Sequence, residues 1–470
     1  MSNVPQQAGP AVADPPLRPH RVLLWCGLLL GGSLVFMMPP FGGPDELQHF
    51  LRAYQCSEGA LYASRSGPAV GGEMPSSLYT IYRVATGNAK RGEDLCVGLH
   101  VSWQRIQAAW AIPLAAQRRE LMYFPNTSLY SPVVYLPAAV ALWAARWTPC
   151  PPLALLYCGR LANLAVYLTL TVLAVKRTPV LKWTMALVAM MPLSLSLAAS
   201  VSADAVALAL ALLATAAALR LALESAKASA GNLAALALLL SLLALSKQVY
   251  VTMALLFFAI PRNKFGGLRA WLLGMLLVVG LPVTLNVAWA SSVRPLYEPM
   301  VPWVDPPAQA RHILTHLPSY TAAMLKAMVH ADTYVYMIGL LGWLNVFLPK
   351  LAWQYYGLAV LATAVLDRGP RPLPPRMKLA LLGTYAVGAA AVITMVYLSS
   401  DHIGAKRVEG MQPRYLLPLI LLLLQALCGH NLLAAARHSR LFLPVITISA
   451  AAVGIAGAWY AVVMYYYWPL

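Results

Sequence analysis

The stretch VLLWCGLLLGGSLVFMMPPFGGPDELQHFLRAY, residues 22–54, joins an apolar run to an acidic segment that begins where the run ends. The apolar residues 22–38 follow the basic Arg18 and Arg21, and no small-residue cleavage site comes after them. We therefore expect a retained membrane helix rather than a cleaved signal peptide. The segment behind it is expected to lie at the far surface of the membrane.

The composition of the chain sets its class. Apolar residues make up 60% of the 470 residues, and charged residues only 11%. A soluble domain of this size would not tolerate so much apolar surface. The sequence therefore predicts an all-α integral membrane protein that crosses the membrane many times.

About eleven apolar runs, give or take two, are candidates for membrane spans. They are residues 22–38, 153–175, 183–201, 204–223, 232–246, 249–261, 270–290, 351–366, 378–398, 415–435 and 441–464. With residues 1–21 as a cytoplasmic N-terminal tail, every second short loop is basic, as is typical of cytoplasmic loops. Of the 16 acids, only Asp14, Glu224 and Asp367 then lie on the cytoplasmic side.

Residues 22–470 form one transmembrane domain in this interpretation, with two long segments on the outer side at 39–152 and 291–350. Two further apolar stretches, 131–147 and 334–348, are about long enough to cross, but either one alone would invert the pattern of basic loops. We therefore expect both to be interfacial or re-entrant helices on the outer side. The outer segments carry most of the residues outside the membrane, so function is expected there.

The acidic segment after the first span is the strongest candidate site. On a helix, Asp45, His49 and Arg52 are spaced i, i+4 and i+7, so they share one face. Acids after Pro44 also suit any helix N-terminus, where the macrodipole favours negative charge. Two interpretations follow: a simple helix start, or an active-site carboxylate, Asp45 or its neighbour Glu46, held at the membrane surface.

Three further charges lie near the outer ends of expected spans. Lys247 interrupts an apolar run, so it either snorkels to the interface or binds an anion. Asp204 has the form of a helix N-cap region. Arg414 lies against the membrane, and with Lys247 and the loop residues Lys406 and Arg407 it would suit a lipid phosphate. For loop charges of this kind, simple solvation is the alternative.

Other features argue against nucleic acid and zinc as partners. The formal charge of +18 follows the basic cytoplasmic loops, and attraction to anionic lipid headgroups explains it without a nucleic-acid surface. The 6 cysteines show no CxxC spacing. Cys56 and Cys96 both fall in the first outer segment, where they form either a disulfide or two free thiols. The sequon that begins at Asn126 is interpreted as chance.

Six short motifs run in order through residues 39–418. They are PDExxHxxRAY (44–54), LYSPVVYLP (129–137), SAD (202–204), SK (246–247), GWLN (342–345) with Pro349, and QPRYLLP (412–418). In this order they resemble a bacterial membrane family catalogued as a domain of unknown function, which looks like a branch of the GT-C glycosyltransferases. Two details depart from that family's pattern: the second motif lacks the usual His-Pro-Pro opening, and Pro413 stands where Gly is commoner.

The resemblance implies a GT-C-like fold and transfer of a sugar from a polyprenyl-phosphate donor to a glycan or lipid-linked acceptor. The site would face the periplasm, in a bacterial inner (plasma) membrane, and transfer would usually proceed with inversion. Asp45 maps to the catalytic base, and Glu46 is the reserve base, a metal ligand or an orienting group. Donor phosphate contacts are expected from Arg52, Lys247, Lys406, Arg407 and Arg414. Orienting or acceptor contacts are expected from His49, Tyr130, Asp204 and Tyr415. The sequence identifies no cofactor and leaves a divalent metal open.

Two other functions remain as alternatives. A transporter or flippase for lipid-linked saccharides would also need a basic cavity, but it usually carries ionisable groups near the midplane and repeated halves. A noncatalytic scaffold would leave Asp45 dispensable. Outer aromatic residues would stack on sugars in an enzyme, or form an interfacial belt in any membrane protein. They are Trp103, Trp110, Tyr123, Tyr130, Trp303 and Trp343.

Overall fold

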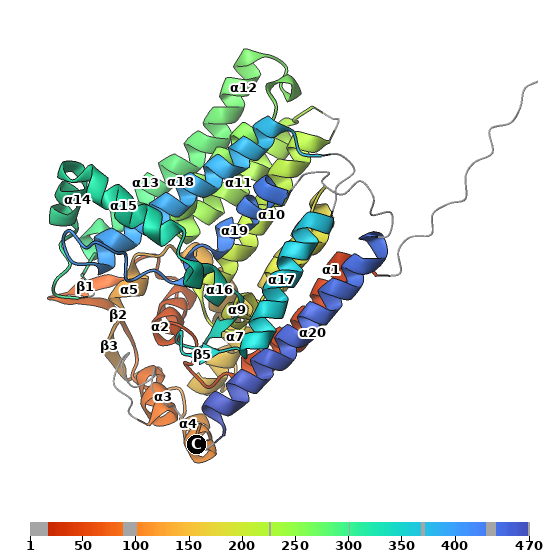
Figure 1. The fold of residues 1–470 in the computed structure, drawn as a ribbon. Helices are drawn as coiled ribbons and strands as arrows, with labels where there is room; N and C mark the ends of the chain where they lie inside the picture. Colours follow the sequence, from red (N-terminus) through yellow and green to blue (C-terminus); the bar gives the residue numbers. More distant parts are fainter. Residues whose placement is uncertain are drawn as a thin grey trace, which may run out of the picture.

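The computed structural model describes residues 17–87, 101–224, 227–299, 301–367, 372–428 and 439–468. Most of them form helices that run roughly along one direction, and one end of this bundle carries a smaller outer part with a small sheet (Figure 1). Two buried apolar cores correspond to these layers, one among the long helices and one in the outer part.

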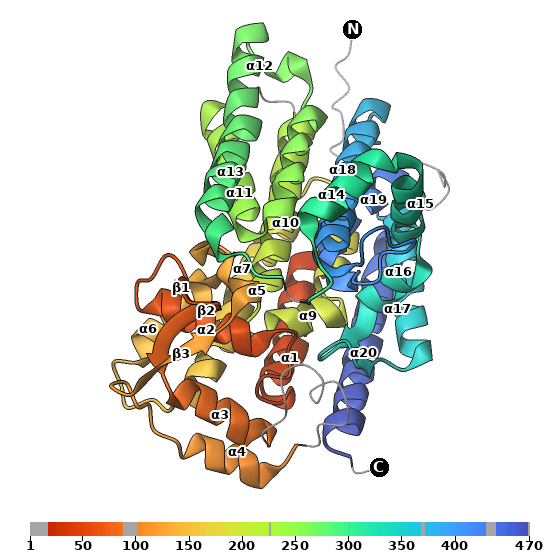
Figure 2. The same cartoon turned by 90° about the vertical axis from the view of Figure 1, so that its left-hand side faces the viewer.

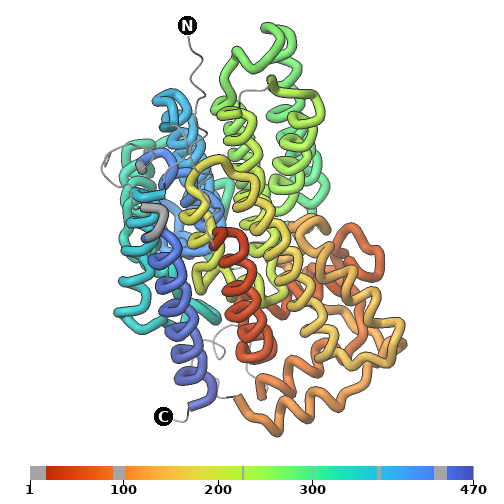
Figure 3. The backbone as a smooth tube through the Cα atoms, turned by 90° about the vertical axis from the view of Figure 1, so that its right-hand side faces the viewer, coloured from red at the N-terminus to blue at the C-terminus, as the bar shows by residue number. Residues whose placement is uncertain are grey.

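Six helical stretches of the described residues are long and apolar enough to cross a membrane. They are α1 (Pro19–Met37), α7 (Pro152–Arg177), α10 (Ala203–Leu223), the run Leu268–Leu296, α18 (Pro375–Ser400), and the run Phe442–Tyr467, most of it in α20 (Ser439–Tyr466). The run Leu268–Leu296 joins α12 (Leu268–Met275), the π-helical turn η5 (Leu276–Gly280), α13 (Leu281–Val293) and the 3₁₀ turn η6 (Arg294–Leu296). Each stretch overlaps an expected span, which supports a multi-pass membrane protein. Figure 3 views the bundle from the right-hand side of Figure 1 and shows α1, in red, and α20, in blue, side by side.

The other candidate spans are shorter or irregular. α11 (Ala230–Ser246) and α17 (Lys350–Leu366) are helices of 17 residues each, and α19 (Leu417–Cys428) is described for 12 residues. Residues 249–261, expected as a membrane helix, form the 3₁₀-helix η3 (Gln248–Ala259). Because a 3₁₀-helix rises about 2 Å per residue, its 12 residues reach about 24 Å, farther than an α-helix of equal length. The count of about eleven spans stays a prediction.

The expected span 183–201 is two short helices rather than one. α8 (Lys182–Ala189) ends two residues before α9 (Pro192–Ala198), because Pro192 lacks an N–H and disfavours a helical Met191. Every residue from 183 to 201 is buried. Hydroxyl groups donate hydrogen bonds to the carbonyl groups around the break. Tyr356 donates to Leu187 (2.8 Å), Ser194 to Val188 (3.0 Å) and Tyr167 to Ala189 (2.8 Å).

The first outer segment contains an antiparallel sheet that the expected all-α fold did not include. Strands β1 (Ser64–Ser66), β2 (Ala69–Pro75) and β3 (Arg119–Tyr123) pair in the order β1-β2-β3. A Cβ on Gly71 would lie 1.7 Å from the carbonyl oxygen of Met122, so this close pairing requires glycine. Figure 2 shows the sheet beside α2 and α6. The helices of this segment are α2 (Glu46–Ser57), α3 (Ser77–Thr86), α4 (Trp103–Trp110), α5 (Pro125–Ser128), η2 (Pro132–Tyr135) and α6 (Leu136–Ala145).

The second outer segment is helical with one hairpin. Its helices are α14 (Pro306–Thr315), α15 (Leu317–Met328) and α16 (Ala331–Gly339). The helix expected over 334–348 therefore ends at Gly339, which corrects that prediction. The chain turns there because Gly342 and Leu344 both adopt φ of 62°, and strand β4 (Leu340–Leu341) pairs with β5 (Val346–Phe347).

Candidate functional site

Four charged side chains from distant parts of the chain meet at the end of the helix bundle that carries the small sheet. Asp45 directly precedes α2, Asp204 lies in the first turn of α10, Lys247 follows α11, and Arg414 lies in the 3₁₀ turn η7 (Pro413–Tyr415). Arg414 donates from Nη2 to Asp45 Oδ2 (2.9 Å) and from Nη1 to Asp204 Oδ2 (3.2 Å). The Lys247 ammonium donates to Asp204 Oδ1. We call these four residues the ionic cluster.

The ionic cluster is buried except on the side of Asp45. The exposed fractions of the Asp204, Arg414 and Lys247 side chains are 4%, 5% and 9%, whereas that of Asp45 is 26%. Burying charges is costly unless they pair, and here two cations face two carboxylates. Asp45 is therefore the member of the cluster that is most open to solvent.

The backbone conformation next to each acid directs both carboxylates toward the cations. Asp45 adopts a left-handed conformation with φ of 55° and makes no capping hydrogen bond to α2, so its carboxylate is free to reach Arg414. At α10 the cap is Ser202, whose hydroxyl accepts from the Asp204 N–H (3.1 Å). Asp204 thus lies in the helix N-cap region that the sequence suggested, with Ser202 as the cap residue and Asp204 in the first turn. Asn126 donates from its amide to Asp45 Oδ1 (3.3 Å), so the sequon residue lies at the site.

Aromatic rings surround the ionic cluster. The His49 ring stacks on Tyr130 at 5.9 Å between centroids, and His49 Nδ1 is hydrogen-bonded to the Tyr135 hydroxyl at 2.8 Å. Lys247 Nζ lies 5.3 Å from the centre of the Tyr415 ring, and Arg414 Cζ lies 5.4 Å from it. Burial lowers the pKa of His49 to about 4, so its imidazole is neutral near pH 7. In this state His49 can orient its neighbours as a neutral hydrogen-bonding group.

Glu46 does not face the ionic cluster, although it is adjacent to Asp45. Its carboxylate is fully buried and accepts from Arg160 Nε (2.7 Å) and Nη2 (2.6 Å). It also accepts from the backbone N–H groups of Val201 (3.0 Å) and Gly43 (3.3 Å). The remaining Arg160 donors bind the carbonyl groups of Val35, Met38 and Pro39. This Glu46–Arg160 clamp joins the end of α1, the start of α2, α7 and the chain before α10. These contacts give Glu46 a structural position away from the ionic cluster, and they do not support the roles of reserve base, metal ligand or orienting group that the resemblance implies for it.

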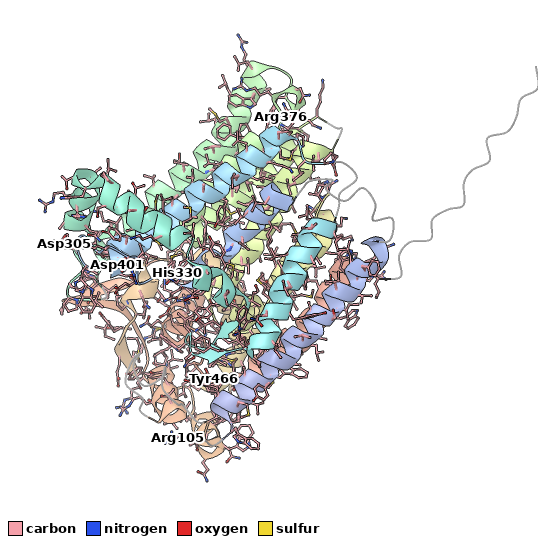
Figure 4. The ribbon with its side chains drawn as sticks, viewed as in Figure 1. Arg105, Asp305, His330, Arg376, Asp401 and Tyr466 are labelled. Carbon is pink, nitrogen blue, oxygen red and sulfur yellow. The ribbon has the colours of Figure 1, made fainter. Side chains whose placement is uncertain are left out.

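Three of the expected phosphate-binding residues lie elsewhere. Arg52 is fully buried and donates to Gln55 Oε1 (2.6 Å) and to the Leu61 carbonyl (2.6 Å), so it holds the chain that leaves α2 rather than a ligand. Lys406 and Arg407 are exposed on the loop after α18, as the solvated alternative required. In Figure 4 that loop starts at Asp401, on the same side of the molecule as Asp305. The structure therefore brings together only Lys247 and Arg414 of the five expected phosphate contacts.

Cysteines, metal ligands and outer aromatics add little to the site. Cys56 is a free thiol, and its expected partner Cys96 lies outside the described residues. No group of three His, Cys, Asp or Glu side chains is placed to hold a metal ion within the part of the chain that the structure describes. Of the expected sugar-stacking residues, only Tyr130 contacts the ionic cluster in the described structure. Trp103, Trp110 and Trp303 are exposed elsewhere, Trp343 donates to the Phe41 carbonyl, and Tyr123 donates to Glu298.

Several contributors to the site escaped the sequence analysis. Arg160 carried a signal, because a charge inside the apolar run 153–175 must find a partner. Tyr135 and Gln412 lie in the motifs 129–137 and 412–418, and Asn126 was noted only as a sequon. Their contacts with the site, such as that of Gln412 Oε1 with Arg414 Nε (2.6 Å), depend on the fold and could not be read from the motifs.

Comparison with known proteins places this chain in a family. The family model described as "Predicted membrane protein (DUF2142)" matches residues 28–423, which is most of the chain. The matched range contains the whole ionic cluster and the Glu46–Arg160 clamp. No curated protein and no solved structure matches the chain. The chain therefore belongs to the DUF2142 family of predicted membrane proteins.

Proposed function

We propose that the protein is a GT-C-type glycosyltransferase that transfers a sugar from a polyprenyl-phosphate donor to a cell-envelope glycan or a lipid-linked acceptor. One observation carries the proposal: a partly exposed carboxylate, Asp45, is held against the buried Arg414, which shares the buried Asp204 with Lys247, at the end of apolar helices. A base beside fixed cations is what attack by a hydroxyl on a phosphate-linked sugar requires.

The proposed reaction is a single displacement with inversion. The acceptor hydroxyl gives its proton to Asp45 and forms a bond to the anomeric carbon of the donor sugar. The bond from that carbon to the phosphate oxygen breaks, and polyprenyl phosphate leaves with the electron pair. Arg414 and Lys247 lie where they would offset the charge that develops on the leaving phosphate.

Charge balance suggests how the donor would engage the ionic cluster. Before binding, Arg414 divides its Nη donors between Asp45 and Asp204. A donor phosphate that takes the Nη2 donor from Asp45 releases that carboxylate at the moment when a base is needed. Asp204 then keeps Arg414 and Lys247 in place, which makes it an orienting residue rather than a second base.

The proposal includes a location. The chain lies in a bacterial inner membrane with its N-terminus in the cytoplasm, and the site faces the periplasm. The support is that Asp45 follows the end of α1, so the site lies at the end of the bundle opposite the basic Arg18 and Arg21 at the start of α1. Figure 1 shows the small sheet at this end of the bundle.

The test of the proposal is Asp45→Asn in purified protein. The change keeps side-chain volume and removes the base, so the transfer rate should fall about 100-fold to 10,000-fold. The assay follows label from polyprenyl-phosphate sugars, extracted from bacterial membranes, into extracted envelope glycan. Glu120→Gln is the matched control, because Glu120 is an outer acid on β3 that is 57% exposed.

Two results would contradict this proposal. Transfer by Asp45→Asn at the wild-type rate would remove Asp45 as the base. If the wild type moves lipid-linked sugar across vesicle membranes and transfers none, the protein is a transporter instead.

A further inference from the structure

A second site of the outer part lies away from the ionic cluster, between the end of α2 and α6. It is a groove of about 640 Å³. One half is lined by Leu136, Val140 and Trp143 of α6, and the other half by Glu58 and Arg146. A groove with an apolar half and a charged half fits an amphiphile better than a wholly polar or wholly apolar ligand.

The apolar half belongs to a stripe that runs along α6 and the turn after it. Leu136, Val140, Trp143 and Trp147 follow one another at helical spacing on one face, and their exposed fractions are 51%, 59%, 52% and 77%. Large apolar side chains gathered on one exposed helix face mark a contact with lipid or protein. Two tryptophans at one end of the stripe are typical of a membrane interface.

The stripe runs outward from the membrane helices. Just before η2 and α6, Ser131 Oγ donates to the carbonyl group of Leu245 (2.8 Å), in the last turn of α11. Farther along α6, Ala138 and Leu142 face Gly159 of α7. The apolar start of the groove therefore lies near membrane helix ends, and Arg146 lies at the other end of α6. A lipid that entered from the bilayer would place its chain along the stripe and its headgroup at Arg146.

The charged half carries one more positive charge than negative charge. Arg119 binds both carboxylate oxygens of Glu58 (3.0 and 2.7 Å), so this acid is already paired. Arg146 reaches Glu58 only at 3.4 Å and donates from Nη2 to the Ser57 carbonyl (2.6 Å). Its Nε is buried and has no acceptor among the described residues. Two guanidinium groups thus face one carboxylate, and the Arg146 side chain is still 19% exposed.

We propose that this groove binds one anionic phospholipid of the surrounding leaflet, with the headgroup phosphate at Arg146 and an acyl chain along the α6 stripe. Arg donors suit phosphate oxygens, and apolar chain burial adds affinity. The bound lipid docks the first outer segment onto the membrane. The proposal does not depend on the proposed enzyme activity.

The test uses full-length protein in nanodiscs of phosphatidylcholine and phosphatidylglycerol in equal parts, with native mass spectrometry of the lipid retained on ejection. The wild type should retain phosphatidylglycerol in preference to phosphatidylcholine. Arg146→Gln should retain it about 10-fold to 100-fold less, because a charge-assisted contact is lost. Arg146→Lys should retain most of the binding, since it keeps the charge. Arg118→Gln, whose side chain is 81% exposed on the nearby loop, is the matched control and should bind as the wild type does.

A second variant guards against misfolding of the first. Val140→Asn places an amide in the apolar half at a position that is 59% exposed, so the fold should survive while lipid retention falls. Wild-type retention of phosphatidylglycerol by both Arg146→Gln and Val140→Asn would overturn the proposal. Equal retention of phosphatidylcholine by the wild type would also overturn it. If glycerol phosphate binds as tightly as phosphatidylglycerol, the site takes a free anion and the lipid assignment fails.

Discussion

Glu46→Gln separates a structural acid from a catalytic one, because Glu46 lies next to the proposed base but faces the other way. The change keeps the side-chain volume, so it opens no cavity. It removes the negative charge that two Arg160 donors contact at 2.6 and 2.7 Å. It also forces one amide nitrogen to face N–H donors, because Glu46 now accepts from Arg160, Val201 and Gly43.

The expected loss of stability is large. Both side chains of the clamp are 0% exposed, and removal of one partner from a buried ion pair costs about 3 to 5 kcal/mol. The control is Glu224→Gln, since Glu224 pairs with Arg220 at 2.7 Å but the two side chains are 50% and 48% exposed. An exposed i,i+4 pair contributes about 0.3 to 0.5 kcal/mol, so this variant should resemble the wild type.

The assay is unfolding of purified protein by dodecyl sulfate, followed by circular dichroism, together with the sugar-transfer rate of the folded fraction. We expect Glu46→Gln to unfold at a clearly lower dodecyl sulfate fraction and its folded molecules to keep transfer activity, in contrast to Asp45→Asn. The reasoning is refuted if Glu46→Gln is as stable as Glu224→Gln. A stable Glu46→Gln protein without transfer activity would indicate that Glu46 takes part in the reaction.

Three further predictions concern the site and its sidedness. Because burial lowers the pKa of His49 from 6.5 to about 4, the folded state stays neutral while the unfolded state takes up a proton, so stability should fall by about 3 kcal/mol as the pH drops from 6.5 to 4. His49→Gln should lack this component, and parallel pH profiles of the denaturation midpoint would contradict it. Lys247→Met and Asp204→Asn remove two ends of one contact, so a double-mutant cycle should show a coupling of about 0.5 to 3 kcal/mol, and additive effects would mean that the contact contributes nothing. Ser66→Cys, exposed on β1, should react with an impermeant thiol reagent in spheroplasts more than the parent chain does. Reaction only after lysis of the inner membrane would place the site in the cytoplasm.

The long helices were predictable because an apolar run of sufficient length has few other places to fold. α7 and α10 follow their apolar runs closely for this reason. The irregular segments were not predictable, because contacts with other parts of the fold determine their backbone conformation. The proline at position 192 could have indicated the break. The break also depends on hydroxyl groups from α7, α9 and α17, which donate to its carbonyl groups. The sheet was missed because β1 and β3 are short and far apart in sequence.

The site was partly predictable, because a charged residue within or beside an apolar segment needs a partner or a ligand. This argument singled out Lys247 and Arg414, whereas Asp45 was named for its spacing to His49 and Arg52, and Asp204 for its place near a helix start. The structure brings all four together. It could not say which way a side chain points. Glu46 and Asp45 are adjacent, yet they face different partners because the left-handed Asp45 turns the chain between them.

The broken segment of α8 and α9 has a consequence for how the protein is made. Its helices of 8 and 7 residues are each too short to cross a bilayer, and lipid offers no partner for the carbonyl groups at their junction. The partners arrive from both sides of the segment in the sequence: Tyr167 precedes it, whereas Tyr356 is synthesised more than 150 residues later. Residues 182–198 therefore cannot settle in the membrane independently as they leave the ribosome. They reach their final position only when α17 is in place, so the ribosome must have passed residue 356 before this part of the protein is complete.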